Sequence, residues 1–234
     1  MQQYNKFMKK IKTLFISFEN EISNNELYAF RSAIVEKAGR NHILFHNHLD
    51  EKKYIYRYPQ IQYKIINKKP SLMCIEKGID EIQHFFNKPN WNLQLYDKTY
   101  ELKVQKLQVN LFTMQVWEHT FYYNLYRWNP FNQNNYRKYK NIDNIDSRKQ
   151  MLEKILIGNI ISFAKGIEWT VDKQIKVEIS QLSEVKWLRY KKTKIACFDV
   201  QFKTNVFLPN YIGLGKHASL GFGIVKQVKE MKND

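Results

Sequence analysis

The sequence is poor in cysteine: Cys74 and Cys197 are the two cysteines in 234 residues. They lie far apart and outside any C-x-x-C pair, which excludes a disulfide scaffold and a zinc ribbon and favours a reducing compartment. Long apolar runs are also missing, since no window approaches the roughly 18–20 uninterrupted apolar residues of a membrane span. The apolar run at residues 14–18 is too short for the core of a signal peptide. We therefore expect a cytoplasmic protein that does not enter a membrane.

Acidic residues are scarce relative to basic ones, because 22 Asp and Glu stand against 38 Lys and Arg, giving a net charge of +16. Residues 1–110 hold 18 basic and 11 acidic residues, and residues 111–234 hold 20 and 11. This excess exceeds the net charge of about 2–8 that keeps a small domain soluble. Because both halves are basic, a polyanion that contacts both is expected, with nucleic acid ahead of an anionic membrane surface. The 44% of hydrophobic residues indicates a globular chain.

Glycine is scarce except in one segment, residues 213–223 (GLGKHASLGFG), which holds four of the eight glycines. Glycine tolerates positive φ and has no side chain to keep another backbone away. A basic glycine loop therefore lets amide groups approach phosphate oxygens, and Lys216 adds charge. The spacing fits neither a P-loop nor a G-x-G-x-x-G dinucleotide loop. A glycine-rich hairpin in a β protein is the alternative that the residues leave open.

The first half of the chain predicts a strand–helix–strand–strand–helix–strand order, which is the ferredoxin-like βαββαβ unit. The expected elements are a strand at 12–19, a helix from Ser23 or Asn24 to about Gly39, a basic strand at 52–58, a hairpin of 61–66 and 71–75 turned at 67–70, a helix at 78–86 and a strand at 93–109.

The second half predicts a degenerate copy of the same unit, on element order alone. Its expected elements are a strand at 115–128, a polar, basic, mobile loop at 131–146, a helix at 147–166, strands at 174–179, 185–192 and 195–202, a turn-like piece at 208–212 and a last strand at 221–228. The predicted fold class is α+β, with tandem ferredoxin-like (RRM-like) domains and a C-terminal glycine-rich loop. Residues 1–110 form the N-terminal domain with its histidines, and residues 111–234 form the C-terminal domain with the loop.

Three of the six histidines, His42, His46 and His48, lie within seven residues. If residues 44–48 are extended, the alternation of side chains puts His46 and His48 on one side. Imidazole titrates near pH 6.5 and suits proton transfer at neutral pH. Three interpretations stay open: structural or surface histidines, a metal site from H-x-x-x-H-x-H, and acid–base catalysis. The metal interpretation is the weakest of the three, because no set of Asp, Glu or Cys ligands is obvious nearby.

Lysine and tyrosine follow the histidines closely. Lys52 and Lys53 come first, and Tyr54, Tyr56 and Tyr58 then alternate along the expected strand. Imidazole, ammonium and phenol are the groups that metal-free RNA cleavage needs: one removes the 2′-OH proton, a cation stabilises the phosphorane and a donor protonates the 5′-oxygen. Half-buried sheet packing is the alternative for the tyrosines.

The stretch LFHNH at 44–48, followed by YRYPQIQYK at 56–64, resembles the N-terminal part of the CRISPR repeat-processing endoribonucleases of the repeat-associated mysterious protein superfamily, in the branch with two neighbouring histidines. Lys69-Pro70 and GIDEI at 78–82 fit the same pattern, and residues 213–223 are similar to the family's C-terminal glycine-rich loop. The resemblance covers roughly residues 10–90 and 205–228, and the middle of the chain is not diagnostic.

The resemblance implies tandem ferredoxin-like domains that bind the repeat RNA of a CRISPR precursor transcript. It implies one cut per repeat, with no metal or other cofactor, leaving a 2′,3′-cyclic phosphate and a 5′-hydroxyl. His46 and His48 match the family's histidine positions, and we expect His48 to be the main general base or acid with His46 assisting. Lys52 and Tyr56 are chosen as supporting catalytic residues because they lie close in the sequence.

The resemblance also assigns the RNA contacts. Gly213, Gly215, Gly221 and Gly223 match the glycine loop, with Lys216 as a phosphate contact. A basic run is predicted to form a groove for the RNA strand, although it also fits an ordinary solvated sheet edge. The run consists of Lys186, Arg189, Lys191, Lys192 and Lys194.

Two other functions remain as alternatives. The same fold can serve as a non-catalytic RNA-binding subunit of a CRISPR effector complex, and His42, His46 and His48 can form a metal-dependent nuclease site. The expected partners are the repeat RNA and, by association, an effector complex. The expected oligomeric state is a monomer or a homodimer.

Overall fold

The computed structural model describes residues 7–46, 57–191 and 193–229. These residues divide into two compact units. The N-terminal unit consists of Lys10–Thr113 together with Ser219–Gly221. The C-terminal unit consists of Met114–Ala218 together with the described residues of Met1–Lys9 and Phe222–Asp234.

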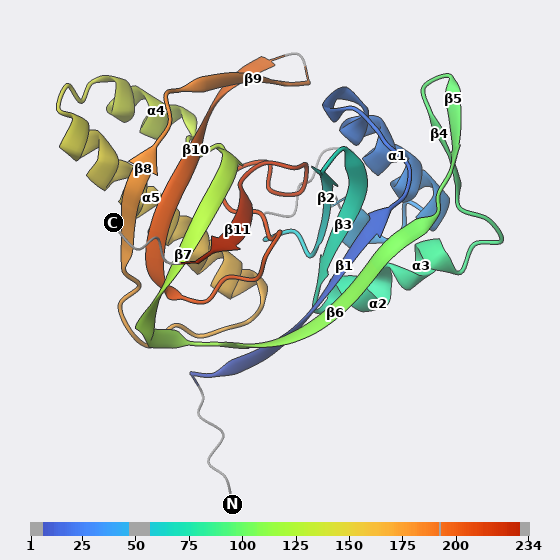
Figure 1. Ribbon diagram of the computed structural model, residues 1–234, viewed down its shortest axis with the longest axis horizontal. Helices are drawn as coiled ribbons and strands as arrows, with labels where there is room; N and C mark the ends of the chain where they lie inside the picture. The colour runs from blue at the N-terminus through green and yellow to red at the C-terminus, as the bar shows by residue number, and fades with distance from the viewer. Residues whose placement is uncertain (1–6, 47–56, 192, 230–234) are drawn as a thin grey trace, which may run out of the picture. The chain divides into compact units, whose positions relative to one another are not determined.

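The N-terminal unit contains a four-stranded sheet in the order β2-β3-β1-β6 (Figure 1). In this order β3 and β1 are the central strands and β2 and β6 are the edge strands. Strand β1 pairs antiparallel with β3. The elements, in chain order, are β1 (Lys9–Phe18), η1 (Asn24–Glu26), α1 (Leu27–Ala38), η2 (Ile43–Phe45), β2 (Ile61–Ile66), β3 (Lys69–Ile75), α2 (Lys77–Glu81), α3 (Gln83–Phe86), β4 (Asn92–Leu95), β5 (Lys98–Glu101) and β6 (Val104–Met114).

Helix α1 forms where the sequence places its start signal, its apolar stripe and its stop. Ser23 and Glu26 form a reciprocal capping box ahead of it. The residues that α1 buries, Leu27, Phe30, Ile34 and Ala38, recur at helical spacing. Gly39 ends the helix at φ 116°, a backbone region that favours glycine. The helix therefore packs through one face, and Phe30 contacts Phe18 and Tyr63 edge-to-face.

Two local predictions in this unit need correction. The hairpin of β2 and β3 turns in two residues, Asn67 and Lys68, both at positive φ, so the expected four-residue turn at 67–70 is too long. The single strand expected at 93–109 is divided into the β4–β5 hairpin and β6. The division falls where Tyr96, at φ 56°, turns β4 back on β5.

The C-terminal unit repeats the strand arrangement of the N-terminal unit. Its sheet has the order β11-β7-β10-β8, and β9 pairs with the far part of β10. No second helix separates β10 from β11, and residues 207–223, which contain the glycine segment, stand in its place. The predicted fold class is thereby confirmed. The elements are β7 (Val116–Trp128), α4 (Gln133–Lys140), α5 (Ile145–Gly166), β8 (Val177–Leu182), β9 (Lys186–Tyr190), β10 (Thr193–Val206) and β11 (Ile224–Val228).

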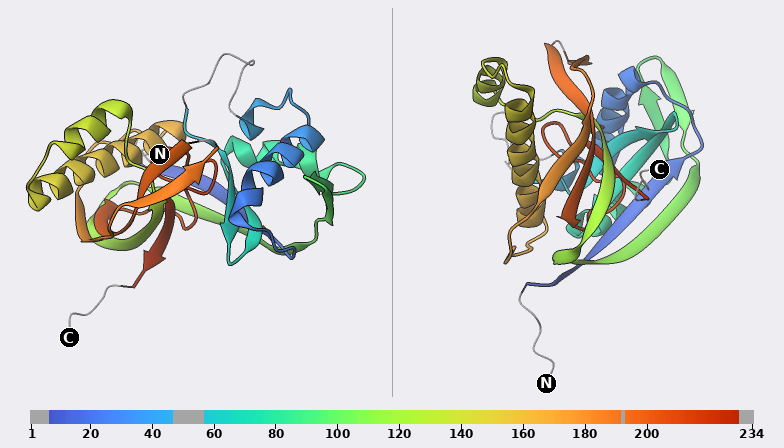
Figure 2. Two further views of the ribbon diagram at one scale, coloured as in Figure 1. Left: turned by 90° about the horizontal axis from the view of Figure 1, so that it is seen from above. Right: turned by 60° about the vertical axis from the view of Figure 1, so that its left-hand side comes forward.

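Helix α4 contradicts the mobile loop expected at 131–146. The Asn132 side chain caps it by accepting from the Asn135 amide at 2.7 Å. Tyr139 is buried and packs on the rings of Phe131 and Phe198. The polar, basic sequence gives no apolar stripe that would predict this helix, because contacts of a few aromatic rings with the rest of the unit stabilise it. Helix α5 covers one face of the sheet (Figure 2).

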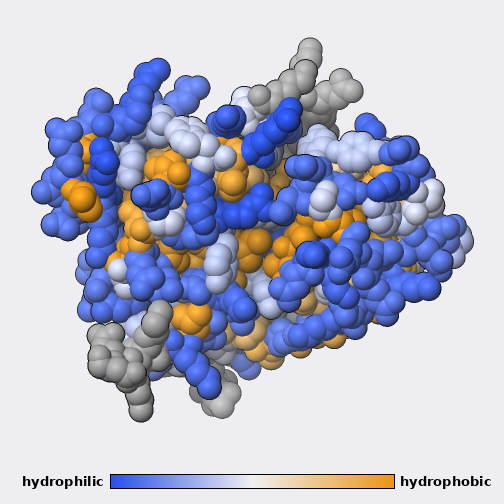
Figure 3. Space-filling model, turned by 45° about the horizontal axis from the view of Figure 1, so that its top comes forward, coloured by the Kyte–Doolittle hydropathy of each residue, from blue (hydrophilic) through white to orange (hydrophobic). Residues whose placement is uncertain are grey.

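In the face drawn in Figure 3, hydrophilic side chains cover most of the area and apolar areas appear between them. None of the helices in the described part of the chain is long and apolar enough to cross a membrane.

Candidate functional site

The segment before His46 is helical rather than extended. Ile43–Phe45 form the 3₁₀ turn η2, and His46 follows it at φ −135° and ψ −9°. The alternation expected for extended residues 44–48 is therefore wrong over this turn. The predicted catalytic residues His48, Lys52 and Tyr56 lie outside the described residues.

Two arginines of the N-terminal unit fix the position of His46. Its Nε2 lies 2.8 Å from the carbonyl oxygen of Arg40, and its own carbonyl accepts from Arg31 Nη2 at 3.0 Å. A carbonyl can only accept, so Nε2 carries the proton in this pair. In the neutral ring Nδ1 is then the nitrogen without a hydrogen.

Tyr63 of β2 holds both the histidine segment and the glycine segment. Its hydroxyl donates to the carbonyl of Phe45, the residue before His46, at 3.1 Å. Its amide donates to the carbonyl of Ser219 at 2.9 Å, and it forms a parallel bridge with Leu220. Tyr63 is fully buried, and burial raises the pKa of its phenol, so the hydroxyl keeps its proton. Within the N-terminal unit, the two sequence motifs therefore meet at one residue.

Sequence reasoning missed the roles of Arg31 and Tyr63. The sequence does not distinguish Arg31 from other basic residues, since a cationic side chain is common on the solvent-facing side of a helix such as α1. The guanidinium of Arg31 lies 6.0 Å from the Tyr63 ring centroid, and its Nε is buried with no hydrogen-bond partner among the described residues. Tyr63 was missed for another reason: the alternation of Ile61, Tyr63 and Ile65 with polar residues predicts a buried ring, but it does not show which groups its hydroxyl and amide contact.

The glycine segment is divided between the two units, because Ser219–Gly221 belongs to the N-terminal unit and the rest to the C-terminal unit. Its flanks form a short antiparallel ladder, in which Gly213 bridges Ile224. Gly223, at φ 61°, has no room for a side chain, since an added Cβ would lie 1.8 Å from the Leu214 carbonyl oxygen. Close packing of the chain against itself thus requires glycine at this position.

Several amides of the segment are already used inside the C-terminal unit. The amide of Leu214 donates to the Gly223 carbonyl, that of Lys216 to the Asn129 carbonyl and that of Gly223 to the Arg127 carbonyl. These three amides are therefore not available to bind phosphate in this conformation, contrary to the role expected for the loop's amides. The Lys216 side chain is exposed and offers its ammonium instead.

His217 of this segment packs against aromatic rings. Its ring stacks on Tyr190 of β9 at 3.8 Å between centroids and meets Phe222 at a steeper angle. Burial, followed by the charges of Lys216 and Lys191, lowers the pKa of His217 to about 4. The imidazole is therefore neutral at pH 7 and contributes stacking rather than charge.

The predicted basic run lies on the β9–β10 hairpin. Arg189 and Lys194 occupy directly paired positions on the two strands, and both are exposed. Lys186 forms an ion pair with Asp199 at 2.5 Å, and Lys191 lies near the ring of Tyr190. The position of Lys192 lies outside the described residues.

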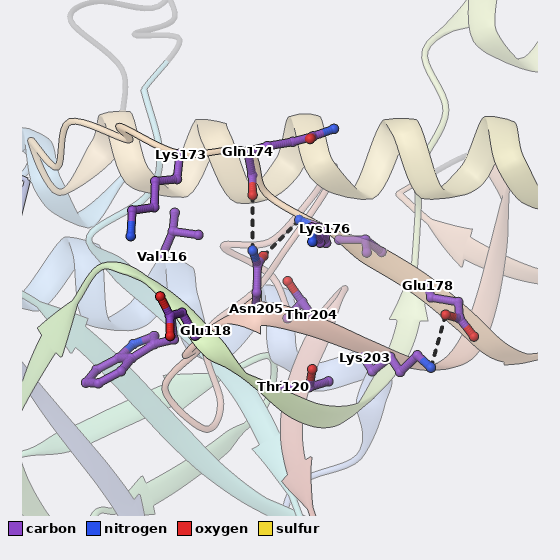
Figure 4. A pocket seen from close by; sticks show the side chains of 12 residues that line it. Val116, Glu118, Thr120, Lys173, Gln174, Lys176, Glu178, Lys203, Thr204 and Asn205 are labelled. Atoms are coloured by element: carbon purple, nitrogen blue, oxygen red, sulfur yellow. Dashed lines mark hydrogen bonds and ion pairs between the residues drawn. The ribbon is translucent and has the colours of Figure 1, made fainter.

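A pocket in the C-terminal unit contains none of the predicted site residues (Figure 4). It lies beside β7, β8 and β10, where Asn205 bonds the Gln174 carbonyl and the Lys176 amide. Lys203 and Glu178 form an ion pair at 3.0 Å on its wall. The Trp117 indole Nε1, also in its lining, is buried without a hydrogen-bond partner among the described residues.

Two family models match this chain: the Cas6b N-terminal domain over residues 9–113 and the Cas6b C-terminal domain over residues 115–228. An uncharacterized protein of Methanocaldococcus jannaschii is 39% identical over 103 residues, which are 44% of this chain and 69% of that protein.

Solved structures agree with these matches. A crystal structure of Cas6b has a TM-score of 0.80 and 28% identity, covering 94% of this chain and all of that one. A crystal structure of the CRISPR RNA processing endoribonuclease Cas6b has a TM-score of 0.72, 25% identity and the same coverage. A type IV Cas6 crRNA endonuclease shares the fold alone, at 11% identity and a TM-score of 0.54 over 94% of this chain and all of that one.

Proposed function

This chain belongs to the Cas6b family, and we propose that it is an endoribonuclease that cleaves CRISPR precursor RNA within the repeats. The name of one solved relative, a CRISPR RNA processing endoribonuclease, supports this function. The observation that carries the proposal is the placement of His46, next to a carbonyl held by Tyr63, the residue that also binds the glycine segment.

The proposed reaction needs no metal ion. A base removes the proton from a 2′-hydroxyl, the oxygen attacks the adjacent phosphorus, and the bond to the 5′-oxygen breaks as an acid protonates it. The products are a 2′,3′-cyclic phosphate and a 5′-hydroxyl. His46 takes part through Nδ1, because the Arg40 carbonyl holds the proton on Nε2. His48 is the other proposed imidazole, and Lys52 and Tyr56 are proposed to support the charge and the proton transfer.

The RNA is proposed to lie along the glycine segment and the β9–β10 hairpin. Gly213, Gly215, Gly221 and Gly223 shape the segment, and Lys216 contacts phosphate through its ammonium. On the hairpin the proposed contacts are Lys186, Arg189, Lys191, Lys192 and Lys194. The pairing of Arg189 opposite Lys194 supports this role, since like charges at facing positions destabilise a hairpin unless an anion lies between them.

The test is incubation of the chain with its cognate repeat RNA in excess chelator, followed by mapping of the cut and of the end groups. We expect one cut per repeat with a cyclic phosphate, and a loss of roughly 10²–10⁴-fold in rate for His46→Ala or His48→Ala. RNA binding by both variants should persist.

Three outcomes would contradict this proposal in different ways. If neither variant changes cleavage, the histidines are not catalytic. If the wild type binds the repeat but does not cut it, the chain is a non-catalytic RNA-binding subunit, which is the second function that the fold allows. If chelator abolishes cleavage and added metal restores it, the reaction is metal-dependent. Association with an effector complex is a further proposal, which co-purification with the other subunits would test.

A further inference from the structure

The structure groups His42 with Glu81 and His84, and not with His46. His42 stands before η2, Glu81 ends α2 and His84 lies in α3, all within the N-terminal unit. The Nδ1 of His42 is 3.2 Å from Glu81 Oε1, and the rings of His42 and His84 stack at 3.7 Å. One ligand atom from each residue lies within 4.8 Å of the other two.

Two imidazoles and one carboxylate are a ligand set that suits zinc and similar divalent transition metals. Glu81 and His84 are three residues apart along the chain, and this Glu-x-x-His spacing places both side chains toward one side of the helical segment. His42 then completes the set from another part of the chain. Nothing in the proposed RNA cleavage uses these three side chains.

One of the three ligand separations is that of a tetrahedral site, and all three ligand atoms lie within 4.8 Å of one another. Bonds of about 2.0–2.1 Å to nitrogen and oxygen place neighbouring ligand atoms about 3.3 Å apart. The separation of His42 Nδ1 and Glu81 Oε1, 3.2 Å, already matches this edge. His84 is exposed, so its stacked ring can rotate to bring a nitrogen to the same point without disturbing the core.

We infer that His42, Glu81 and His84 form a zinc-binding site that ties the segment before His46 to helices α2 and α3. The proposed role of the metal is to hold this segment in place, and its three ligands are not among the residues proposed for RNA cleavage. The sequence led us to expect no metal site, since Glu81 and His84 lie far from His42 along the chain.

The experiment is a calorimetric titration of the full chain, first stripped with chelator, with ZnCl₂ alone. We expect one saturable site, and a higher midpoint of thermal unfolding with zinc than without it, because a ligand of the folded state stabilises that state. Asparagine in place of His84 should weaken binding by at least roughly 10–100-fold. Glu81→Gln, which keeps a hydrogen-bond acceptor for His42, should weaken it as well.

His119→Asn is the matched control, because His119 is an exposed histidine of β7 in the C-terminal unit and should leave zinc binding unchanged. The inference is overturned if the wild type shows no saturable site, or if His84→Asn and Glu81→Gln bind zinc as the wild type does. The latter result would place the metal on other histidines. Because the experiment measures zinc binding, its result does not depend on whether the chain cleaves RNA.

Discussion

Tyr63 donates its hydroxyl to the carbonyl of Phe45 across 3.1 Å, inside the core of the N-terminal unit. The same residue donates its amide to Ser219 in the glycine segment. A substitution that removes one oxygen atom therefore reaches the residue before His46 while the main-chain bond to Ser219 stays. Removing the Tyr63 hydroxyl therefore tests directly whether the bond to Phe45 sets the geometry of the proposed site.

Tyr63→Phe should lower the cleavage rate at saturating protein and leave RNA affinity nearly unchanged, because the Phe45 carbonyl loses its donor and the segment that carries His46 loses one of the bonds that hold it. The buried, unpaired carbonyl should also lower the free energy of unfolding by about 1–3 kcal/mol. Single-turnover kinetics and urea unfolding would measure both effects.

Tyr123→Phe is the control for this prediction. Tyr123 is also fully buried, and its hydroxyl accepts from the Leu208 amide at 2.7 Å in the C-terminal unit. It should cost similar stability without slowing catalysis at saturation. Equal rates for the two variants would show that the Phe45 contact does not position the catalytic group.

Gly223→Ala should strongly destabilise the chain. The new Cβ would lie 1.8 Å from a main-chain oxygen, and φ is 61°, so the backbone would have to move. We expect a loss of at least about 1–3 kcal/mol, measured as a lower midpoint of thermal unfolding.

Gly158→Ala in α5 is the matched substitution with the opposite expected sign, since an added Cβ there meets nothing within 4 Å. It should stabilise the helix by about 0.5–1 kcal/mol. A Gly223→Ala protein as stable as the wild type would show that the segment adopts another conformation.

The stability of the wild type should fall as pH is lowered from about 6.5 to about 4, in part through His217. The pKa of His217 is lowered to about 4 when folded, so in this window the unfolded chain binds the additional proton. His217→Asn removes the part of this dependence that comes from His217, and asparagine tolerates the residue's φ of 59°. Unfolding midpoints at pH 7 and pH 4.5 would test this. A wild type and variant that lose stability equally would contradict the lowered pKa.

Salt should weaken RNA binding less steeply once a phosphate contact is removed. Arg189→Gln should reduce the slope of log K against log salt by about 1. Lys186→Gln should reduce it less, because Lys186 is already paired with Asp199. Fluorescence titrations of repeat RNA at several salt concentrations would give the slopes. An unchanged slope for Arg189→Gln would remove the hairpin from the proposed RNA path.

The order of elements, the helix bounded by Ser23 and Gly39 and the family resemblance all follow from the sequence, because they depend on local periodicity, capping and glycine. Helix α4 did not follow, since its polar residues are held by aromatic contacts with Phe131 and Phe198. The β4–β5 hairpin was also missed, because Tyr96 turns the chain at a position where the sequence shows no glycine.

By itself, the sequence determined that this is a basic α+β chain that resembles the CRISPR repeat-processing endoribonucleases, with histidines and a glycine segment as its marked features. The tertiary structure alone decided that His42 faces Glu81 and His84, and that Arg40 and Phe45 act through their carbonyls. Every residue carries the same carbonyl, so side-chain identity gives no sign of which one a distant group will contact. Only the folded path of the backbone brings such partners together.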